Sequence, residues 1–530
     1  MTVAEYIAHQ LFGKGIRYIF GVPGGPSIEY MEAFRSAGID FILVSNEAAA
    51  GIMADVTARL TGVPGVCHAT FGPGAANLTA GAGSALLDRS PVLLFTSEMD
   101  EKMILRTTQM NINHQKLYEP VTKATFRLTP DNAAEVIDKA IKTSLEEYPG
   151  PVHIGLPSDI AGSETEDVKE SLYPDDFSSN QNDVSQILSQ LERSRRPLIA
   201  AGLTAARYRI GSKLSGLLEK CRIPVILTPM AKGLIHEDHP CYAGVLFHAL
   251  SDYMDDIIAE CDLIIGLGYD PVEYNYESWI PEVPLIHFDT KVIDMPALNN
   301  IFQFAGHPDE WFGILSKMDQ SSYIFNRSSV QSVQDEIVSV FKGFTDHFGA
   351  VTAFKVLQEE LPVNTIMTID VGSHLHVAGQ YWKTGGKQNI IMTNGWSGMG
   401  FALPAALAVK LNDHAATVVC VTGDGGFLMM AGEIVTARRY NLPVVVIVFS
   451  DGELNLIRLK QSWQNLAPYG TRLYSGDLFD SEVFFGISVL TAVSEETMRT
   501  AVNEALSMNK PVIINARIDP DDYKWLVVRK

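Results

Sequence analysis

Two carboxylates in the last third of the chain, Asp424 and Asp451, lie 27 residues apart, each just after an apolar run typical of a buried strand. Asp424 belongs to the turn Gly423-Asp424-Gly425-Gly426, which is followed by a helical pattern from Leu428 to Tyr440. Glycines at such a turn let backbone N–H groups approach phosphate oxygens, and the helix N-terminus adds a favourable dipole. A carboxylate is unfavourable beside a phosphate unless a cation separates them, and Mg²⁺ prefers hard oxygen ligands. The pattern predicts a magnesium–diphosphate site, against the alternative of an ordinary turn with a capping Asp.

A third carboxylate, Glu47, lies near the other end of the chain, among alanines and just after the apolar run Phe41–Val44. An isolated acid in small apolar surroundings is suited to proton transfer with a bound ligand. The alternative is an acid at the cap or on the surface of a helix, which is common. Together with the diphosphate turn, Glu47 indicates an enzyme that uses an activated cofactor.

Short apolar runs alternate with helical patterns along the whole chain, as expected for parallel strands buried between two layers of helices. The polar segments Ser163–Asn182 and Asp319–Asp335 interrupt this alternation, and the first is typical of a linker. We therefore predict three doubly wound α/β domains with parallel sheets, at 1–162, 183–318 and 345–530. The expected strands are Arg17–Val22, Asp40–Val44, Pro64–Thr70, Pro91–Thr96, Gly150–Pro157, Pro197–Gly202, Pro224–Thr228, Cys261–Gly268, Pro284–Asp289, Thr365–Asp370, Thr417–Thr422 and Pro443–Phe449.

Composition excludes several classes of protein. The formal net charge of −21 argues against a nucleic-acid-binding surface, and 46% hydrophobic with 19% charged residues is typical of a globular protein. The five cysteines are widely spaced without a Cys-x-x-Cys pair, which argues against a disulfide framework or a zinc site. Neither a signal peptide nor an apolar run long enough for a membrane helix is visible. We expect a cytoplasmic protein that binds no membrane.

The segment Gly423–Ile457 resembles the diphosphate–metal motif of the thiamine-diphosphate enzymes, a Gly-Asp-Gly followed at similar spacing by Asn. The resemblance implies that Asp424 and Asp451 are side-chain ligands of Mg²⁺ and that the backbone carbonyl of Glu453 is a third ligand. It also places Gly423, Gly425 and Gly426 at the cofactor diphosphate. The family usually has Asn where this chain has Asp451, a change that keeps an oxygen ligand and adds a negative charge.

Glu47 matches the activating glutamate of the same family. The resemblance implies that its side chain bonds N1′ of the cofactor aminopyrimidine, and so promotes removal of the thiazolium C2 proton. Two glycine-rich loops, Gly21–Gly25 and Phe71–Asn77, resemble the family loops around the pyrimidine and the substrate, although plain turn chemistry explains most such loops. They supply the expected cofactor contacts Pro23, Gly24, Gly72 and Asn77, and the expected substrate pocket consists of Gly25, Phe71, His114 and Gln115.

Two further segments are similar to cofactor-binding loops of the family. In Gly395–Pro404, Met399 would wedge between the two cofactor rings, and backbone groups of Ser397 and Met399 would hold the pyrimidine. A buried Met is more often core filler. In Asp370–His376, the expected diphosphate contacts are Gly372, Ser373 and His374, whereas His376 is as compatible with a structural role as with a functional one.

The resemblance covers essentially the whole chain and is closest to the FAD-independent acetolactate synthases. The run Asp262–Tyr274 contains their Gly-Tyr-x-Pro-Val-Glu-Tyr stretch and lacks the arginine found there in FAD-binding relatives, so FAD is not expected. Pro120–Lys123 and Gly425–Leu428 are also similar to that branch. One position departs from it, because Met110 aligns with a pocket Gln of the synthases.

By this resemblance the chain decarboxylates a 2-oxo acid and joins the remaining unit to an acceptor carbonyl, with pyruvate the expected donor. The alternatives are a simple 2-oxo acid decarboxylase, a lyase or acyltransferase acting on a sulfonated or CoA-linked substrate, and a non-catalytic protein that binds the cofactor. The decarboxylase alternative would use pocket histidines as proton relays, among His68, His114, His374 and His376. Because the family builds each site from two subunits, a homodimer at minimum and commonly a homotetramer is expected.

Overall fold

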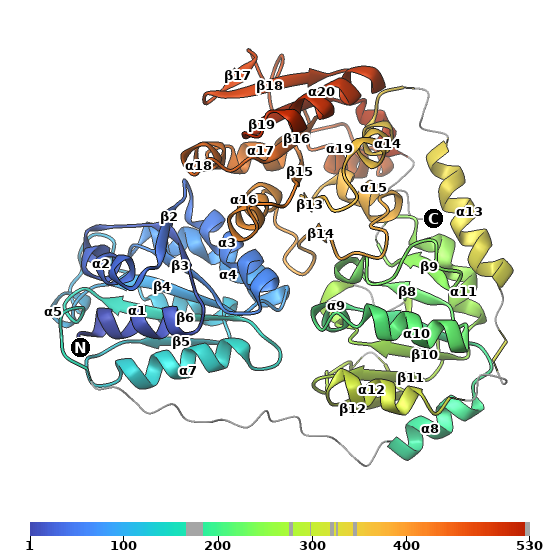
Figure 1. Cartoon of the computed structure of the whole chain (residues 1–530), viewed down its shortest axis with the longest axis horizontal. Coiled ribbons are helices and arrows are strands. Elements are labelled where there is room, and N and C mark those ends of the chain that lie inside the picture. Colours follow the sequence, from blue (N-terminus) through green and yellow to red (C-terminus); the bar gives the residue numbers. More distant parts are fainter. Residues whose placement is uncertain are drawn as a thin grey trace.

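The computed structural model describes residues 1–165, 184–247, 249–274, 279–296, 298–318, 323–324, 327–342 and 347–524, and their strands form three sheets (Figure 1). All three sheets are parallel except for one antiparallel pair, so the predicted α/β class is confirmed. Most of the predicted linker Ser163–Asn182 lies outside the described residues. No helix in the described part is long and apolar enough to cross a membrane.

The N-terminal sheet has the strand order β2-β1-β3-β4-β6-β5. Helices α1, α2 and α7 pack on one face around one apolar cluster, and α3 and α4 pack on the other. The strands are β1 (Tyr18–Val22), β2 (Asp40–Leu43), β3 (Gly65–Ala69), β4 (Val92–Glu98), β5 (Ala124–Arg127) and β6 (Pro151–Pro157). The helices are α1 (Val3–Gly13), α2 (Ile28–Ala37), α3 (Glu47–Thr61), α4 (Pro73–Leu87), α5 (Glu101–Ile104), α6 (His114–Tyr118) and α7 (Ala133–Leu145).

The central sheet has the order β12-β11-β10-β7-β8-β9. Its strands are β7 (Pro197–Ala201), β8 (Val225–Leu227), β9 (Tyr242–Val245), β10 (Leu263–Leu267), β11 (Leu285–Asp289) and β12 (Ile301–Ala305). Its helices are α8 (Val184–Arg193), α9 (Leu203–Arg207), α10 (Gly211–Cys221), α11 (Asp255–Glu260) and α12 (Pro308–Leu315).

The C-terminal sheet has the order β14-β13-β15-β16-β19-β18-β17, in which β17 and β18 form the antiparallel pair. Its strands are β13 (Ile366–Ile369), β14 (Ile390–Ile391), β15 (Val418–Gly423), β16 (Val445–Ser450), β17 (Val483–Phe484), β18 (Ile487–Ala492) and β19 (Val512–Arg517). Its helices are α14 (Ala350–Glu360), α15 (Ser373–Tyr381), α16 (Ala402–Asn412), α17 (Asp424–Met430), α18 (Glu433–Arg439), α19 (Asn455–Trp463) and α20 (Glu495–Ser507).

The N-terminal and C-terminal units share an apolar core, because α3 packs against both α4 and α16 (Figure 1). The polar segment Asp319–Asp335 is partly helical: α13 (Arg327–Lys342) buries Val330 and Val333 against the core shared by the central and C-terminal units. Its polar residues occupy the outer face, as expected for an amphipathic helix.

The helical pattern from Leu428 to Tyr440 does not form one helix, and this expectation was wrong. The structure has α17 and α18, separated at Ala431 and Gly432. The hydroxyl of Ser45 donates to the carbonyl of Gly432 at 2.8 Å, and a Cβ on this glycine would lie only 3.0 Å from Cβ of Ser45. The helix is thus interrupted where Ser45 of the N-terminal unit contacts the backbone of Gly432. The hydrophobic periodicity of the sequence does not reveal this contact.

Candidate active site

The Asp424 carboxylate lies at the N-terminus of α17, and four donors converge on it. Oδ1 accepts from the N–H of Gly425 at 2.8 Å. Oδ2 accepts from the N–H of Asp451 at 3.1 Å, the N–H of Gly452 at 2.7 Å and the hydroxyl of Tyr474 at 2.8 Å. Burial raises the pKa of Asp424, although these bonds act in the opposite direction. The carboxylate is therefore held in one orientation.

Asp451 follows β16, the strand next to β15. Asp424 and Asp451 therefore lie together at the carboxyl ends of two neighbouring parallel strands. Burial, and secondly the nearby Asp424, raise the pKa of Asp451 to about 7. Two carboxylates that oppose each other's ionisation would be stabilised by a divalent cation between them.

Glu453 is two residues further along the same loop and donates its N–H to Oδ1 of Asp451 at 3.1 Å. It also forms an isolated antiparallel bridge with Arg472, closed by the flanking bonds from Leu454 N–H to Thr471 O and from Leu473 N–H to Gly452 O. These flanking bonds leave the Glu453 carbonyl out of the bridge. Two carboxylates and a backbone carbonyl are hard oxygen donors, and this set fits Mg²⁺.

The start of α15 faces the same turn. The ring of His374 lies against two glycines, since a Cβ would approach its Cε1 to 3.3 Å at Gly423 and to 2.7 Å at Gly372. Burial lowers the pKa of His374 to about 4. His374 Nε2 and the hydroxyl of Ser373 are buried without a hydrogen-bond partner in the described structure. Buried polar atoms usually have partners, so these two fit a ligand that carries phosphate oxygens.

Met399 also reaches the glycine turn, because a Cβ on Gly425 would lie 2.9 Å from its Cε atom. Gly426 is equally constrained, since a Cβ on this glycine would lie only 2.5 Å from the carboxylate of Asp370. Ser397, two residues before Met399, has a left-handed backbone with φ of 53°. Strained backbone of this kind persists where the surroundings determine it and is frequent at functional sites.

Glu47 is the first residue of α3, and the side chain of Asn46 caps this helix by accepting from the N–H of Ala48 at 2.8 Å. Glu47 is only 8% exposed. Asn77 in α4 donates its side-chain amide to Oε2 of Glu47 at 3.1 Å, and a Cβ on Gly74 would lie 3.1 Å from Oε1. The two helices therefore bring Asn77 and Glu47 together.

The two glycine loops of the N-terminal unit touch each other. A Cβ on Gly24 would lie 2.3 Å from Oγ1 of Thr70, so the loop that contains Pro23 and Gly24 abuts the residue before Phe71. Gly72 has a φ of 70° and donates its N–H to Nε2 of His114 at 3.3 Å. The two loops and the start of α6 therefore lie together.

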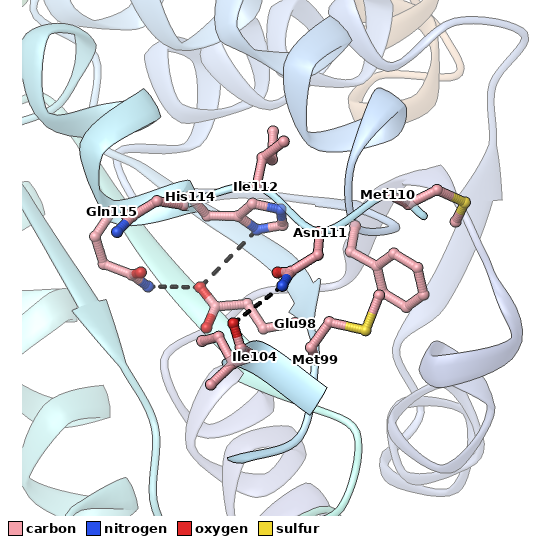
Figure 2. A pocket seen from close by; sticks show the side chains of 10 residues that line it. Glu98, Met99, Ile104, Met110, Asn111, Ile112, His114 and Gln115 are labelled. Carbon is pink, nitrogen blue, oxygen red and sulfur yellow. Dashed lines mark hydrogen bonds and ion pairs between the residues drawn. The ribbon is translucent and has the colours of Figure 1, made fainter. Parts of the chain in front are cut away.

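A cavity of about 170 Å³ lies beside these loops (Figure 2). Three of the four expected pocket residues, Phe71, His114 and Gln115, line it, whereas Gly25 is exposed and is not part of its wall. Met110, the departure noted in the sequence, also contributes to the wall. The full lining is Phe71, Glu98, Met99, Ile104, Met110, Asn111, Ile112, Asn113, His114 and Gln115.

Glu98 in this wall was not anticipated. Its carboxylate accepts from Gln115 at 2.5 Å and from Arg127 at 2.8 Å, and burial raises its pKa although both partners act against this. No motif surrounds Glu98 or Arg127 in the sequence, and β5, which carries Arg127, was not among the expected strands.

The spacing of Glu98, His114 and His153 would allow a metal ion, but a hydroxyl already fills the space between the rings. Oγ1 of Thr96 lies 2.9 Å from Nδ1 of His114 and 2.8 Å from Nε2 of His153. Because Gly72 donates to Nε2 of His114, the neutral ring carries its proton on Nδ1 and donates it to Thr96. Thr96 therefore links the His114 and His153 rings in a hydrogen-bonded chain, and burial lowers the pKa of His114 to about 4.

Sequence comparison identifies relatives of each unit. Residues 1–117 match the family described as thiamine pyrophosphate enzyme, N-terminal TPP binding domain. Residues 184–301 match the central domain of the thiamine pyrophosphate enzymes, and residues 370–516 match their C-terminal TPP binding domain. Together the three matches span well over half of the chain.

Three curated proteins illustrate the full-length similarity. The chain is 29% identical to the probable acetolactate synthase large subunit of Methanocaldococcus jannaschii, over 98% of this chain and 92% of the relative. It is 27% identical to the acetolactate synthase isozyme 2 large subunit of Escherichia coli, over 100% and 97%. It is 25% identical to the acetolactate synthase of Bacillus subtilis, over 98% and 93%.

Proposed function

The chain belongs to the thiamine pyrophosphate enzymes, and from that premise we propose that it decarboxylates a 2-oxo acid and ligates the product to an acceptor carbonyl. Relatives named acetolactate synthase along the full length support an acetolactate synthase-like activity that depends on thiamine diphosphate. We propose pyruvate as the donor and Mg²⁺ as the metal. Asp424, Asp451 and the carbonyl of Glu453 would hold the ion.

The observation that carries this proposal is the buried Glu47 carboxylate beside the glycine surface of Gly74. When bound, thiamine diphosphate supplies a thiazolium that accepts the electron pair released by decarboxylation. Glu47 would hold a proton at the pyrimidine N1′ position. The side-chain amide of Asn77 would orient the Oε2 atom of Glu47. Ser373 Oγ and His374 Nε2, both buried without partners in the described structure, would bind the diphosphate.

Glu47 and Asp424 belong to different units of the chain. Glu47 contacts Gly74 and Asn77, whereas Asp424 contacts Asp451 and Tyr474. None of these four contacting residues touches both carboxylates through these contacts. We propose that a second copy of the chain completes each site, and therefore a homodimer or a homotetramer built from it.

The decarboxylase alternative requires a proton donor in the pocket. His114 lines the cavity, but its Nδ1–H is engaged by Thr96 and its Nε2 by Gly72. His68 is bonded to Ser27 at 2.7 Å and lies outside the cavity wall. A sulfonated or CoA-linked substrate would favour a basic pocket, yet none of the described residues of the wall is Lys or Arg. The contacts of His114 and His68, and a described wall without Lys or Arg, support ligation of a small 2-oxo acid that carries no second anionic group.

The test is mass-spectrometric product analysis with a panel of 2-oxo acids, with and without added aldehydes, in the presence of thiamine diphosphate and Mg²⁺. The proposal expects a carboligation product from pyruvate alone. Free aldehyde as the sole product from every acid would overturn ligation and favour the decarboxylase. A protein that binds the cofactor but converts no acid would favour the non-catalytic alternative.

A further inference from the structure

The segment Met392–Gly400, here called the cofactor loop, has no regular secondary structure after β14 and carries Ser397 and Met399. Residues of another unit fix its first half. Oδ1 of Asp88, at the end of α4, accepts from the N–H of Asn394 at 3.2 Å and from the N–H of Gly395 at 2.9 Å. The carboxylate of Asp88 in the N-terminal unit therefore fixes the backbone of the cofactor loop in the C-terminal unit.

Arg59, in the last turn of α3, also binds the loop and holds Asp88. Its guanidinium donates to the carbonyl of Met392 at 2.7 Å and to Oδ2 of Asp88 at 2.9 Å. It is itself held by Asp55 through two bonds of 2.7 and 2.6 Å. Asp55 and Asp88 are buried, so these are bonds between charges away from water. The planar guanidinium of Arg59 serves two carboxylates and a carbonyl together, one carboxylate in a bidentate manner, a geometry that the single nitrogen of lysine does not reproduce.

The far end of the loop is fixed by a second buried carboxylate. Oδ1 of Asp370 accepts from the N–H of Gly400 at 2.8 Å and from the N–H of Phe401 at 3.2 Å, while Oδ2 accepts from the hydroxyl of Thr422 at 2.8 Å. Between these two held ends, Ser397 has a left-handed conformation and Met399 lies against Gly425.

We propose that Arg59 and Asp88 are positioning residues that preorganise the cofactor loop for thiamine diphosphate without touching it. The inference rests on the proposed function for the role of the loop. A loop that is already ordered costs less to bind, whereas a loop that populates its competent form only a tenth of the time binds about tenfold more weakly.

An ion pair that merely joins two units would produce a different result. Arg207 and Glu147 form such a pair between the central and N-terminal units, with bonds of 3.1 and 2.7 Å, and within the described part of the chain neither side chain is hydrogen-bonded to the cofactor loop. Arg207→Lys and Glu147→Gln are therefore matched controls for the change of an interunit ion pair.

The experiment measures the Kd of thiamine diphosphate by calorimetry in saturating Mg²⁺, with melting temperature as the check on folding. Asp88→Asn and Arg59→Lys should each raise this Kd by about tenfold or more. They should also raise the cofactor concentration needed for half-maximal rate while largely sparing kcat at saturation. The two control variants should leave the Kd unchanged.

A wild-type Kd in folded Asp88→Asn and Arg59→Lys proteins would overturn the inference, as would an equal rise in the controls. Should one variant fail to fold, the other carries the same test. If the wild-type protein does not bind thiamine diphosphate, the proposed function fails, and this outcome is distinct from failure of the positioning role alone.

Discussion

The hydroxyl of Tyr474 donates a 2.8 Å hydrogen bond to Oδ2 of Asp424, the carboxylate proposed to bind the metal. Groups that orient a metal ligand without touching the ion typically change metal affinity by about 10- to 100-fold when they are removed. Tyr474→Phe should therefore weaken Mn²⁺ binding by about tenfold, measured by electron paramagnetic resonance titration in the presence of thiamine diphosphate.

Tyr469 in the same loop is a suitable control because this residue is 88% exposed. Tyr469→Phe should leave the Mn²⁺ affinity at the wild-type value. Equal affinities for Tyr474→Phe and the wild-type protein would show that Asp424 does not need this hydroxyl.

Glu47→Gln should abolish turnover while largely sparing cofactor binding, because the amide keeps the size of the side chain but cannot shuttle a proton. The rate of hydrogen–deuterium exchange at the cofactor C2 position, followed by proton NMR, should fall by at least about 100-fold. Exchange at the wild-type rate in Glu47→Gln would refute the proposed role, and calorimetry with thiamine diphosphate checks that the cofactor is bound.

If each site combines Glu47 of one copy with Asp424 of another, two inactive variants should complement each other. Glu47→Gln and Asp424→Asn, dissociated together and reassembled, should recover about a quarter of the wild-type activity. Half of the randomly formed dimers are mixed, and one of the two sites in each is intact. Subunit exchange confirmed by native mass spectrometry, with no recovered activity, would place both residues in the same chain's site.

The fold buries several neutral histidines, and this should limit stability in acid. Burial lowers the pKa of His68 to about 4, so the unfolded chain binds a proton near its ordinary pKa of about 6.5 before the folded chain does. This contribution is complete above pH 6.5 and is lost as pH falls towards 4. Urea unfolding at a series of pH values should show a smaller acid loss in His68→Asn, by up to about 3 kcal/mol. If the free energy of unfolding of His68→Asn falls with decreasing pH as steeply as that of the wild-type protein, His68 does not limit stability in acid.

The strands of the fold are predictable from the sequence where both faces of the sheet are buried. Each expected strand overlaps an observed one, because continuous apolar runs are what the middle of a parallel sheet requires. Five strands that were not expected, β5, β9, β12, β14 and β17, all lie at sheet edges. Edge strands need fewer apolar residues, so a pattern based on hydrophobicity does not reveal them. The neighbouring β18 and β19 were also not among the expected strands, although β19 is buried along most of its length.

The candidate site was foreseeable in its motifs but not in the residues that support them. Glycine turns and isolated acids such as Glu47 and Asp424 stand out by type and spacing. Asp88, Glu98 and Tyr474 do not, because their partners are far away in the sequence and their roles exist only after folding. Gly25 was expected in the pocket by its position in a loop, yet the loop turns it to the surface.

The proposed ligation is tested most directly by its stoichiometry. With ¹³C-labelled pyruvate as the sole substrate, together with thiamine diphosphate and Mg²⁺, the pyruvate consumed and the CO₂ released are measured in one sealed NMR sample. Two pyruvate molecules consumed for each CO₂, with 2-acetolactate as the product, is the predicted result. One pyruvate consumed for each CO₂, with free acetaldehyde, would contradict the account.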